Sequence, residues 1–130
     1  MHQFLTTRLG VKEDRIHALY NEAATRIGIL AGFKRLVMEP KIKKDDPILI
    51  YFAGHGAQVP APAKWEIGGI NPQIQSLLPQ DYNPEKGVHV IPDRTIGALL
   101  NHIAAEKGNN IVGIQFRYFR KFQPLADVQT

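Results

Sequence analysis

Continuous apolar runs along this chain predict its strands. The most informative run, Ile48–Ala53, leads directly into Gly54-His55-Gly56, and its content of Ile, Tyr and Phe predicts a strand buried on both faces. Shorter runs predict strands at Ile16–Leu19 and from Ile111 onward. The two glycines leave the imidazole of His55 with little side-chain bulk beside it. Since ligands and catalytic groups gather at the carboxyl ends of strands in open α/β sheets, His55 is the first candidate for chemistry.

Apolar residues at helical spacing predict two helices between these strands. The first begins at a cap, for which Asn21 and Thr25 are both plausible, and ends at Pro40. The second begins at Asp93, a good cap, and ends at Gly108. Strands that alternate with helices predict a three-layer α/β/α sandwich with a mostly parallel sheet.

One segment interrupts this alternation. Residues 59–75 are rich in Pro and Gly, and they predict a long loop or an irregular hairpin. Within it, Trp65 is either an anchor of the loop or part of a cleft wall. Ser76, which follows, is the only serine of the chain, and it has no base at a readable spacing. We therefore do not expect a serine nucleophile.

Composition excludes several classes of function. No stretch of the 130 residues approaches the ~20 apolar residues of a membrane span, and the first residues lack a signal-peptide pattern, so we expect a cytoplasmic protein with no membrane partner. The net charge is +4, and the basic residues are scattered among acids, which favours a solvated surface over nucleic-acid binding. The chain has no cysteine, which excludes disulfides, thiolate metal sites and thiol catalysis.

The histidines and glycines are the remaining candidates for binding sites. His17, His89 and His102 show no ligand spacing, so neither a metal nor another cofactor is expected. The glycines beside His55 lack the spacing of a nucleotide-binding loop. For His55 itself, the residue pattern leaves two interpretations open, which are a catalytic position and a turn histidine at the end of a strand.

Three segments in order carry a resemblance to a known family: ILIYFAGHGAQ from Ile48, LLPQDY from Leu77 and IPDRTIGALLNHI from Ile91. Together they resemble the caspase-like domain of the caspase and metacaspase clan, in its fungal form, over roughly residues 4–111. The resemblance implies cysteine-endopeptidase chemistry on polypeptide substrates, in which a histidine assists a thiolate that attacks the peptide carbonyl. Calcium dependence occurs in metacaspase relatives, and the residues of this chain do not indicate it.

Three residues of this chain match the family's functional positions. The resemblance implies that His55 is the catalytic histidine and that the backbone N–H of Gly56 is an oxyanion donor. It also implies that Asp81 lies near the substrate cleft, although Asp81 equally fits a turn.

The nucleophile that the resemblance requires is absent. In the family the cysteine motif ends the strand after the one that carries the histidine, and where the resemblance places that motif this chain has Arg117 and Tyr118. The family pattern stops at Ile111, so we expect residues 112–130 to form a divergent tail that is disordered or non-native, such as translated intron. The family's first strand is also missing, which predicts an incomplete fold with an unfilled slot between the strands at Ile16 and Ile48.

The sequence therefore predicts a partial caspase-like domain over residues 1–111 that lacks peptidase activity on its own. Two alternatives remain open. One is a non-catalytic decoy that pairs with a full-length caspase-like protein through an exposed sheet edge. The other is a truncated gene-model fragment with no independent role.

Overall fold

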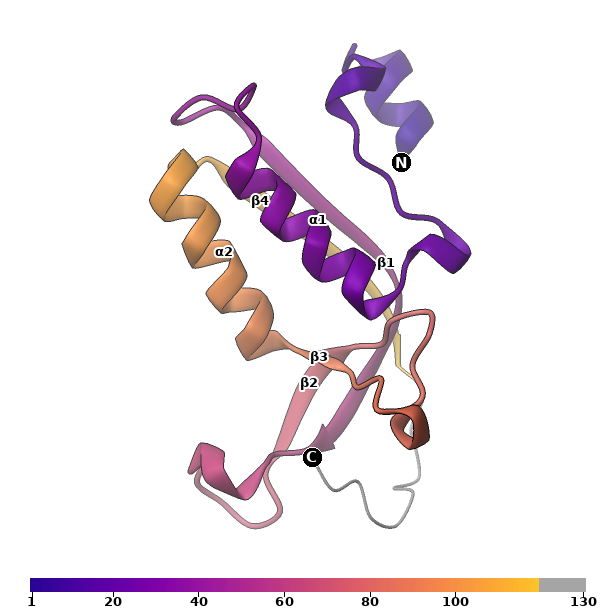
Figure 1. The fold of residues 1–130 in the computed structure, drawn as a ribbon, viewed down its shortest axis with the longest axis vertical. Helices are drawn as coiled ribbons and strands as arrows, with labels where there is room; N and C mark the ends of the chain where they lie inside the picture. Colours follow the sequence, from indigo (N-terminus) through magenta and orange to yellow (C-terminus); the bar gives the residue numbers. More distant parts are fainter. Residues whose placement is uncertain (120–130) are drawn as a thin grey trace.

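The structure, a computed structural model, describes residues 1–119, with the backbone alone for residues 115–119. Its main elements follow one another along the chain as helix α1 (Arg26–Met38), strands β1 (Ile48–Pro60), β2 (Gln73–Leu77) and β3 (Ile91–Pro92), helix α2 (Asp93–Lys107) and strand β4 (Ile111–Phe119) (Figure 1). Short helical turns lie at Phe4–Arg8, Glu13–Arg15, Asn21–Ala23, Ala63–Trp65 and Pro84–Lys86. The fold is mixed α/β, as predicted.

The described strands form a sheet in the order β3-β2-β1-β4. β1 and β4 are parallel over nine residue pairs, from Ile48 with Ile111 to Gly56 with Phe119. The pairs β1–β2 and β2–β3 are antiparallel, so the prediction of a mostly parallel sheet is wrong for the described strands. The cause is the Pro/Gly-rich segment after β1, which reverses the chain so that β2 runs antiparallel to β1 as a hairpin. The parallel pair of β1 and β4 needs a longer crossover connection, and α2 is part of it.

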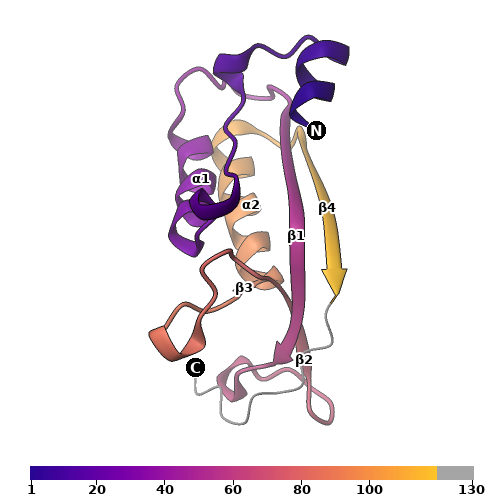
Figure 2. The same ribbon diagram turned by 90° about the vertical axis from the view of Figure 1, so that its right-hand side faces the viewer.

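Helices α1 and α2 lie together on one face of the sheet (Figure 2). On the opposite face, Leu49 and Tyr51 of β1 and Val112 of β4 are 41%, 38% and 56% exposed. The three-layer sandwich and the strand buried on both faces are therefore wrong. Burial instead alternates along β1, because the described helices pack against only one of its faces.

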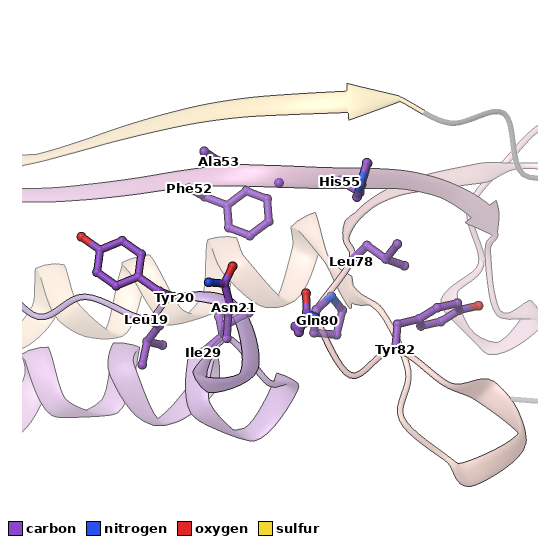
Figure 3. Close-up of a pocket in the computed structure, with 13 residues that line it drawn as sticks. Leu19, Tyr20, Asn21, Ile29, Phe52, Ala53, His55, Leu78, Gln80 and Tyr82 are labelled. Carbon is purple, nitrogen blue, oxygen red and sulfur yellow. The ribbon is translucent and has the colours of Figure 1, made fainter. Parts of the chain in front are cut away.

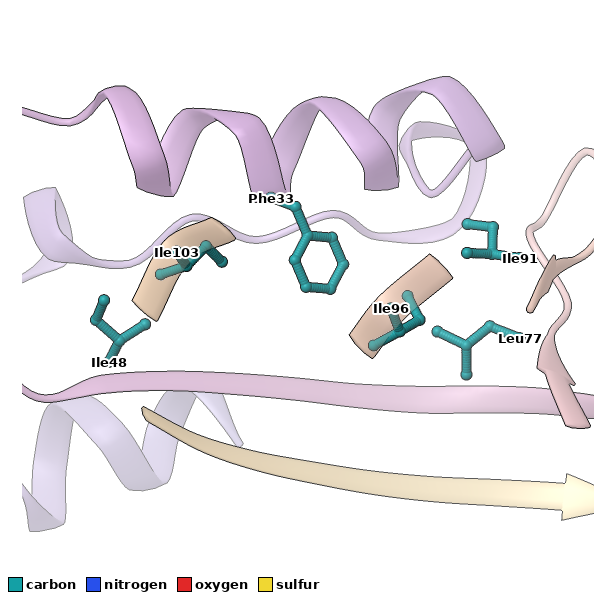
Figure 4. Close-up of a cluster of buried hydrophobic side chains, with 6 residues drawn as sticks. All are labelled: Phe33, Ile48, Leu77, Ile91, Ile96 and Ile103. Carbon is teal, nitrogen blue, oxygen red and sulfur yellow. The ribbon is translucent and has the colours of Figure 1, made fainter. Parts of the chain in front are cut away.

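A core of six buried side chains fills the space between the helices and the sheet (Figure 4). Its members come from α1, α2 and the first three strands, and they are Phe33, Ile48, Leu77, Ile91, Ile96 and Ile103. Fully burying a side chain of this size stabilises a fold by about 1.5–3 kcal/mol. The packing of α1 and α2 over the β1–β2–β3 part of the sheet thus supplies most of the buried apolar surface.

The helix boundaries follow the predicted ones closely. The hydroxyl of Thr25 accepts the Gly28 N–H at 3.0 Å, which confirms Thr25 as the cap of α1. The cap predicted at Asp93 is wrong by one residue, since Pro92 holds the cap position and α2 begins at Asp93 itself. Gly108 ends α2 with a positive φ of 90°. Within residues 1–119, no helix has the length and apolar content to cross a membrane.

The other predicted segments differ more. The irregular hairpin is confirmed. The guanidinium carbon of Arg94 lies 5.1 Å from the centroid of the Trp65 ring, and this contact anchors the loop to α2. The strand predicted at Ile16–Leu19 is wrong, because this segment joins no described ladder. β4 begins at Ile111 as predicted and continues to Phe119, across the domain boundary expected there. The rest of the predicted tail, residues 120–130, lies outside the described residues.

The carboxyl end of α2 holds the connection that leads into β1. The Lys107 ammonium donates to the carbonyls of Glu39 and Ile42 at 2.8 and 2.9 Å. The Lys107 carbonyl accepts the Asp45 N–H at 2.7 Å, and the first N–H of β1 then donates to the Asn110 carbonyl at 2.9 Å. These bonds bring the starts of β1 and β4 side by side.

Gly108→Ala should destabilise the fold. A Cβ at this position would collide with the Asp45 side chain, and the positive φ adds a cost of about 1 kcal/mol for a residue with a side chain. We expect the free energy of unfolding to fall by about 2–4 kcal/mol in urea titrations.

The matched control for this change is Gly97→Ala. Gly97 lies inside α2 with open space around it, so alanine there should stabilise the helix by up to about 1 kcal/mol. Equal effects at positions 97 and 108 would contradict the role assigned to Gly108.

Ser76→Ala should leave stability unchanged or raise it. Ser76 is fully buried, and its Oγ has no hydrogen-bond partner among the described residues. Removing an unsatisfied buried hydroxyl should add up to about 1 kcal/mol to the free energy of unfolding, measured by urea titration. A loss of more than about 1 kcal/mol would mean that the hydroxyl is hydrogen-bonded in solution.

Candidate functional site

His55 lies inside β1, not at its end. The strand continues through Gly54–Gly56 to Pro60, because its second half pairs with β2. The prediction that the strand stops at Ala53 is therefore wrong. The His55 carbonyl accepts the Leu78 N–H at 3.0 Å, where the segment after β2 meets β1, and the residue is exposed. The hairpin thus fixes the backbone on which the imidazole stands.

The parallel register of β1 and β4 places the segment around His55 beside the segment around Tyr118, although the two lie far apart in the sequence. Gly54 pairs with Arg117, and His55 pairs with Tyr118. Neighbouring strands lie about 4.8 Å apart. The positions where the resemblance places the nucleophile are therefore next to His55 on the neighbouring strand. Neither arginine nor tyrosine provides a thiolate.

The N–H of Gly56 faces β4. The N–H of Ile48 donates toward β4, and alternation along a strand turns every second N–H to the same edge. Gly56 lies four of these two-residue steps after Ile48, so its N–H points to the same edge. Gly56 still belongs to the β1–β4 ladder, where it pairs with Phe119. Its role as an oxyanion donor stays a prediction, and that role requires β4 to separate from β1 at this point.

A cavity of about 380 Å³ opens beside His55 (Figure 3). Three segments line it together with α1, and these are the turn before α1, the middle of β1 and the segment after β2. The lining residues are Leu19, Tyr20, Asn21, Ala24, Ile29, Phe52, Ala53, Gly54, His55, Leu78, Pro79, Gln80 and Tyr82. None of these lining residues is Asp, Glu, Lys or Arg. The volume is that of a site for a small ligand or for a few residues of a peptide.

Two hydrogen bonds hold the walls of the cavity together. The Gln80 N–H donates to the Ala24 carbonyl at 2.9 Å, and the Asp81 carboxylate accepts the Arg26 N–H at 2.8 Å. The negative charge of Asp81 therefore sits at the positive end of the α1 dipole. Asp81 lies between two lining residues and does not itself line the cavity, and its contact with substrate stays a prediction.

Sequence reasoning found part of this site. The ILIYFAGHGAQ and LLPQDY segments supply two of its walls. It missed the third wall, Leu19–Asn21 with Ala24, because that segment carries no motif and reaches the cavity only through the packing of α1. The bond from Asp81 to α1 was also missed, since 55 residues separate its partners. Nothing local in the sequence signals it.

His17 lies away from this site and contacts α1. The His17 Nδ1 lies 2.9 Å from the Arg35 Nη1, so this ring tethers the segment before α1 to the helix. Among the described residues, no three His, Asp or Glu side chains come together as ligands of a metal ion.

We compared the chain with protein-family models, with curated proteins and with solved structures, and none of these comparisons found a match.

Proposed function

We propose that this chain is a caspase-like peptidase scaffold that keeps the histidine of a Cys-His dyad and lacks the nucleophile. The observation that carries the proposal is the register of β1 and β4, in which His55 is adjacent to Tyr118 and Gly54 to Arg117. A thiolate dyad needs its two side chains on neighbouring elements within reach of each other. The chain has no cysteine at any position, so the scaffold is inert as a peptidase on its own.

The cavity supports a polypeptide as the molecule that such a scaffold meets. Its lining combines apolar side chains with the amides of Asn21 and Gln80 and the hydroxyls of Tyr20 and Tyr82. Amides and hydroxyls hydrogen-bond peptide groups without requiring a charged ligand. Neither a metal nor an organic cofactor is part of the proposal.

A second candidate function is a non-catalytic interaction module that pairs with another polypeptide, such as a full-length caspase-like protein. The observation that favours it is the edge of β1 opposite β4. β2 pairs with that edge only from Gly56 onward, and no other described strand lies along it.

The purified chain should show no turnover of fluorogenic peptides with either basic or acidic P1 residues. The expected rate equals the buffer blank, because no residue supplies a thiolate. The matched control is His55→Ala, which should give the same blank rate. Turnover by the unmodified chain that His55→Ala abolishes would contradict the claim of inactivity.

A cysteine introduced at position 118 should become a reactive thiol that depends on His55. Residues in register on neighbouring strands share a face of the sheet, and a nearby imidazolium lowers the pKa of a thiol. We expect Tyr118→Cys to react with iodoacetamide at pH 7 about threefold to tenfold faster than a free thiol. Adding His55→Ala should remove that acceleration.

Val112→Cys is the control for this experiment. It lies on the same strand, it is exposed, and it pairs with Leu49, far from His55 along the ladder. Its alkylation rate should be that of a free thiol, with or without His55. If the two cysteine variants react at equal rates, position 118 is not adjacent to the imidazole and the proposed dyad geometry fails.

A further inference from the structure

The edge of β1 that faces away from β4 presents backbone groups before it meets β2. The N–H of Ile48 points to β4, so alternation turns the N–H and C=O of Leu49 and Ala53 to the opposite edge. On that edge the β1–β2 pairing starts only at Gly56. Within residues 1–119, no strand pairs with the edge between Ile48 and Gly56.

The cavity beside His55 lies at the end of this edge, with Phe52, Ala53 and Gly54 of β1 in its wall (Figure 3). Opposite them stand Leu19 and Tyr20, which belong to the segment before α1. The edge and the cavity thus form a continuous surface, which we call the β1 edge groove: the edge of β1 from Leu49 to Ala53 together with the lining of the cavity.

The outer wall of the groove is also extended backbone. Ile16 and Tyr20 have β-region dihedrals, with φ/ψ of −107°/120° and −113°/141°. The contact between His17 and Arg35 holds this segment to α1. No described ladder joins it to β1. Two stretches of extended backbone therefore flank the cavity without pairing to each other.

We propose that the β1 edge groove is a docking site for an extended segment of another protein, uncharged and apolar at alternate positions. Backbone donors and acceptors spaced along a strand edge recognise an extended main chain, which adds to the sheet as a further strand. The apolar side chains of Phe52, Ile29 and Leu19 receive every second side chain of the ligand.

The charge of the lining sets the chemistry of this ligand. The lining holds no Asp, Glu, Lys or Arg, and its one imidazole, His55, is exposed. Over Leu19, Ile29 and Phe52, a charged side chain would lose hydration without gaining an opposite charge. The inward positions of the ligand are therefore residues such as Val, Ile or Leu. The main chain supplies affinity and these positions supply selectivity.

This inference rests on the second candidate function, binding without catalysis, and not on the histidine chemistry. Turnover in the fluorogenic assay would overturn the peptidase-scaffold proposal and leave the groove unaffected. Failure of peptide binding would overturn the groove and leave the thiol experiments unaffected.

The test is fluorescence anisotropy with the labelled, uncharged peptide acetyl-Thr-Val-Thr-Val-Thr-Val-Thr-amide as the probe. We expect saturable binding at protein concentrations up to about 1 mM. Two changes should each weaken binding at least tenfold. One is methylation of the backbone nitrogens of the probe, which removes its main-chain donors. The other is Ala53→Pro in the protein, which removes an N–H from the groove and leaves the β1–β4 ladder intact.

The matched control is Gly113→Pro, whose N–H faces the outer edge of β4, opposite β1. It should leave the affinity unchanged. Binding lost with Gly113→Pro and retained with Ala53→Pro would assign the peptide to β4 and overturn the proposal. So would a lack of binding to the unmodified chain. A dimer in sedimentation experiments that Ala53→Pro dissociates would make a second copy the occupant, which also overturns it.

Hydrogen exchange on the unmodified chain provides a measurement that does not depend on the folding of any variant. The peptide should slow exchange at the amides of Leu49 and Ala53, which face the groove, by at least tenfold. The amides of Ile50 and Phe52 face β4 and should change little, because the ladder already protects them. Equal slowing at all four amides would indicate general stabilisation and would overturn strand addition at this edge.

Discussion

The arrangement of this chain depends on the junction at the carboxyl end of α2. The Lys107 ammonium binds two carbonyls of the connection between α1 and β1, and the next residue, Gly108, turns the chain with a positive φ close against Asp45. The junction starts β1 and β4 in one register, with Ile48 beside Ile111. A slip of one residue would turn every side chain of a strand to the other face, so the position of His55 relative to β4 is set here, seven residues before the imidazole.

In the part of the chain that the structure describes, helices cover the sheet on one side only. α1 and α2 bury Ile48 and its neighbours on one face, while Leu49, Tyr51 and Val112 remain partly exposed on the other. Apolar residues on an exposed sheet face and backbone groups at an open edge both favour association. A partner that covers them would also stabilise the folded chain, since binding to the native state alone adds to its stability. Any partner bound at these surfaces would therefore raise the stability of the folded chain.

The sequence predicted those features that local chemistry controls. Thr25, Pro40 and Gly108 mark the ends of helices through their own backbone and side-chain preferences, and the Pro/Gly-rich segment signals a hairpin. The layers and strand directions depend on which faces meet, which no local pattern encodes. The run Ile48–Ala53 is apolar on both faces, yet only one face is buried. Asp81 was assigned to a cleft through its motif, whereas its bond to the start of α1 depends on a residue 55 positions away.

The two edges of β1 have different consequences for chemistry and for binding. A cysteine peptidase needs a nucleophile beside the histidine and an N–H group free to stabilise the oxyanion. On the β4 edge the chain has no cysteine, and the Gly56 N–H is directed into the ladder. The missing cysteine and the direction of the Gly56 N–H are physically independent, because introducing a cysteine would not turn this N–H away from β4. On the opposite edge, the N–H groups of Leu49 and Ala53 face away from β4, and no strand within residues 1–119 pairs with them. The geometry of β1 therefore supports the proposal that this chain binds a polypeptide without cleaving it.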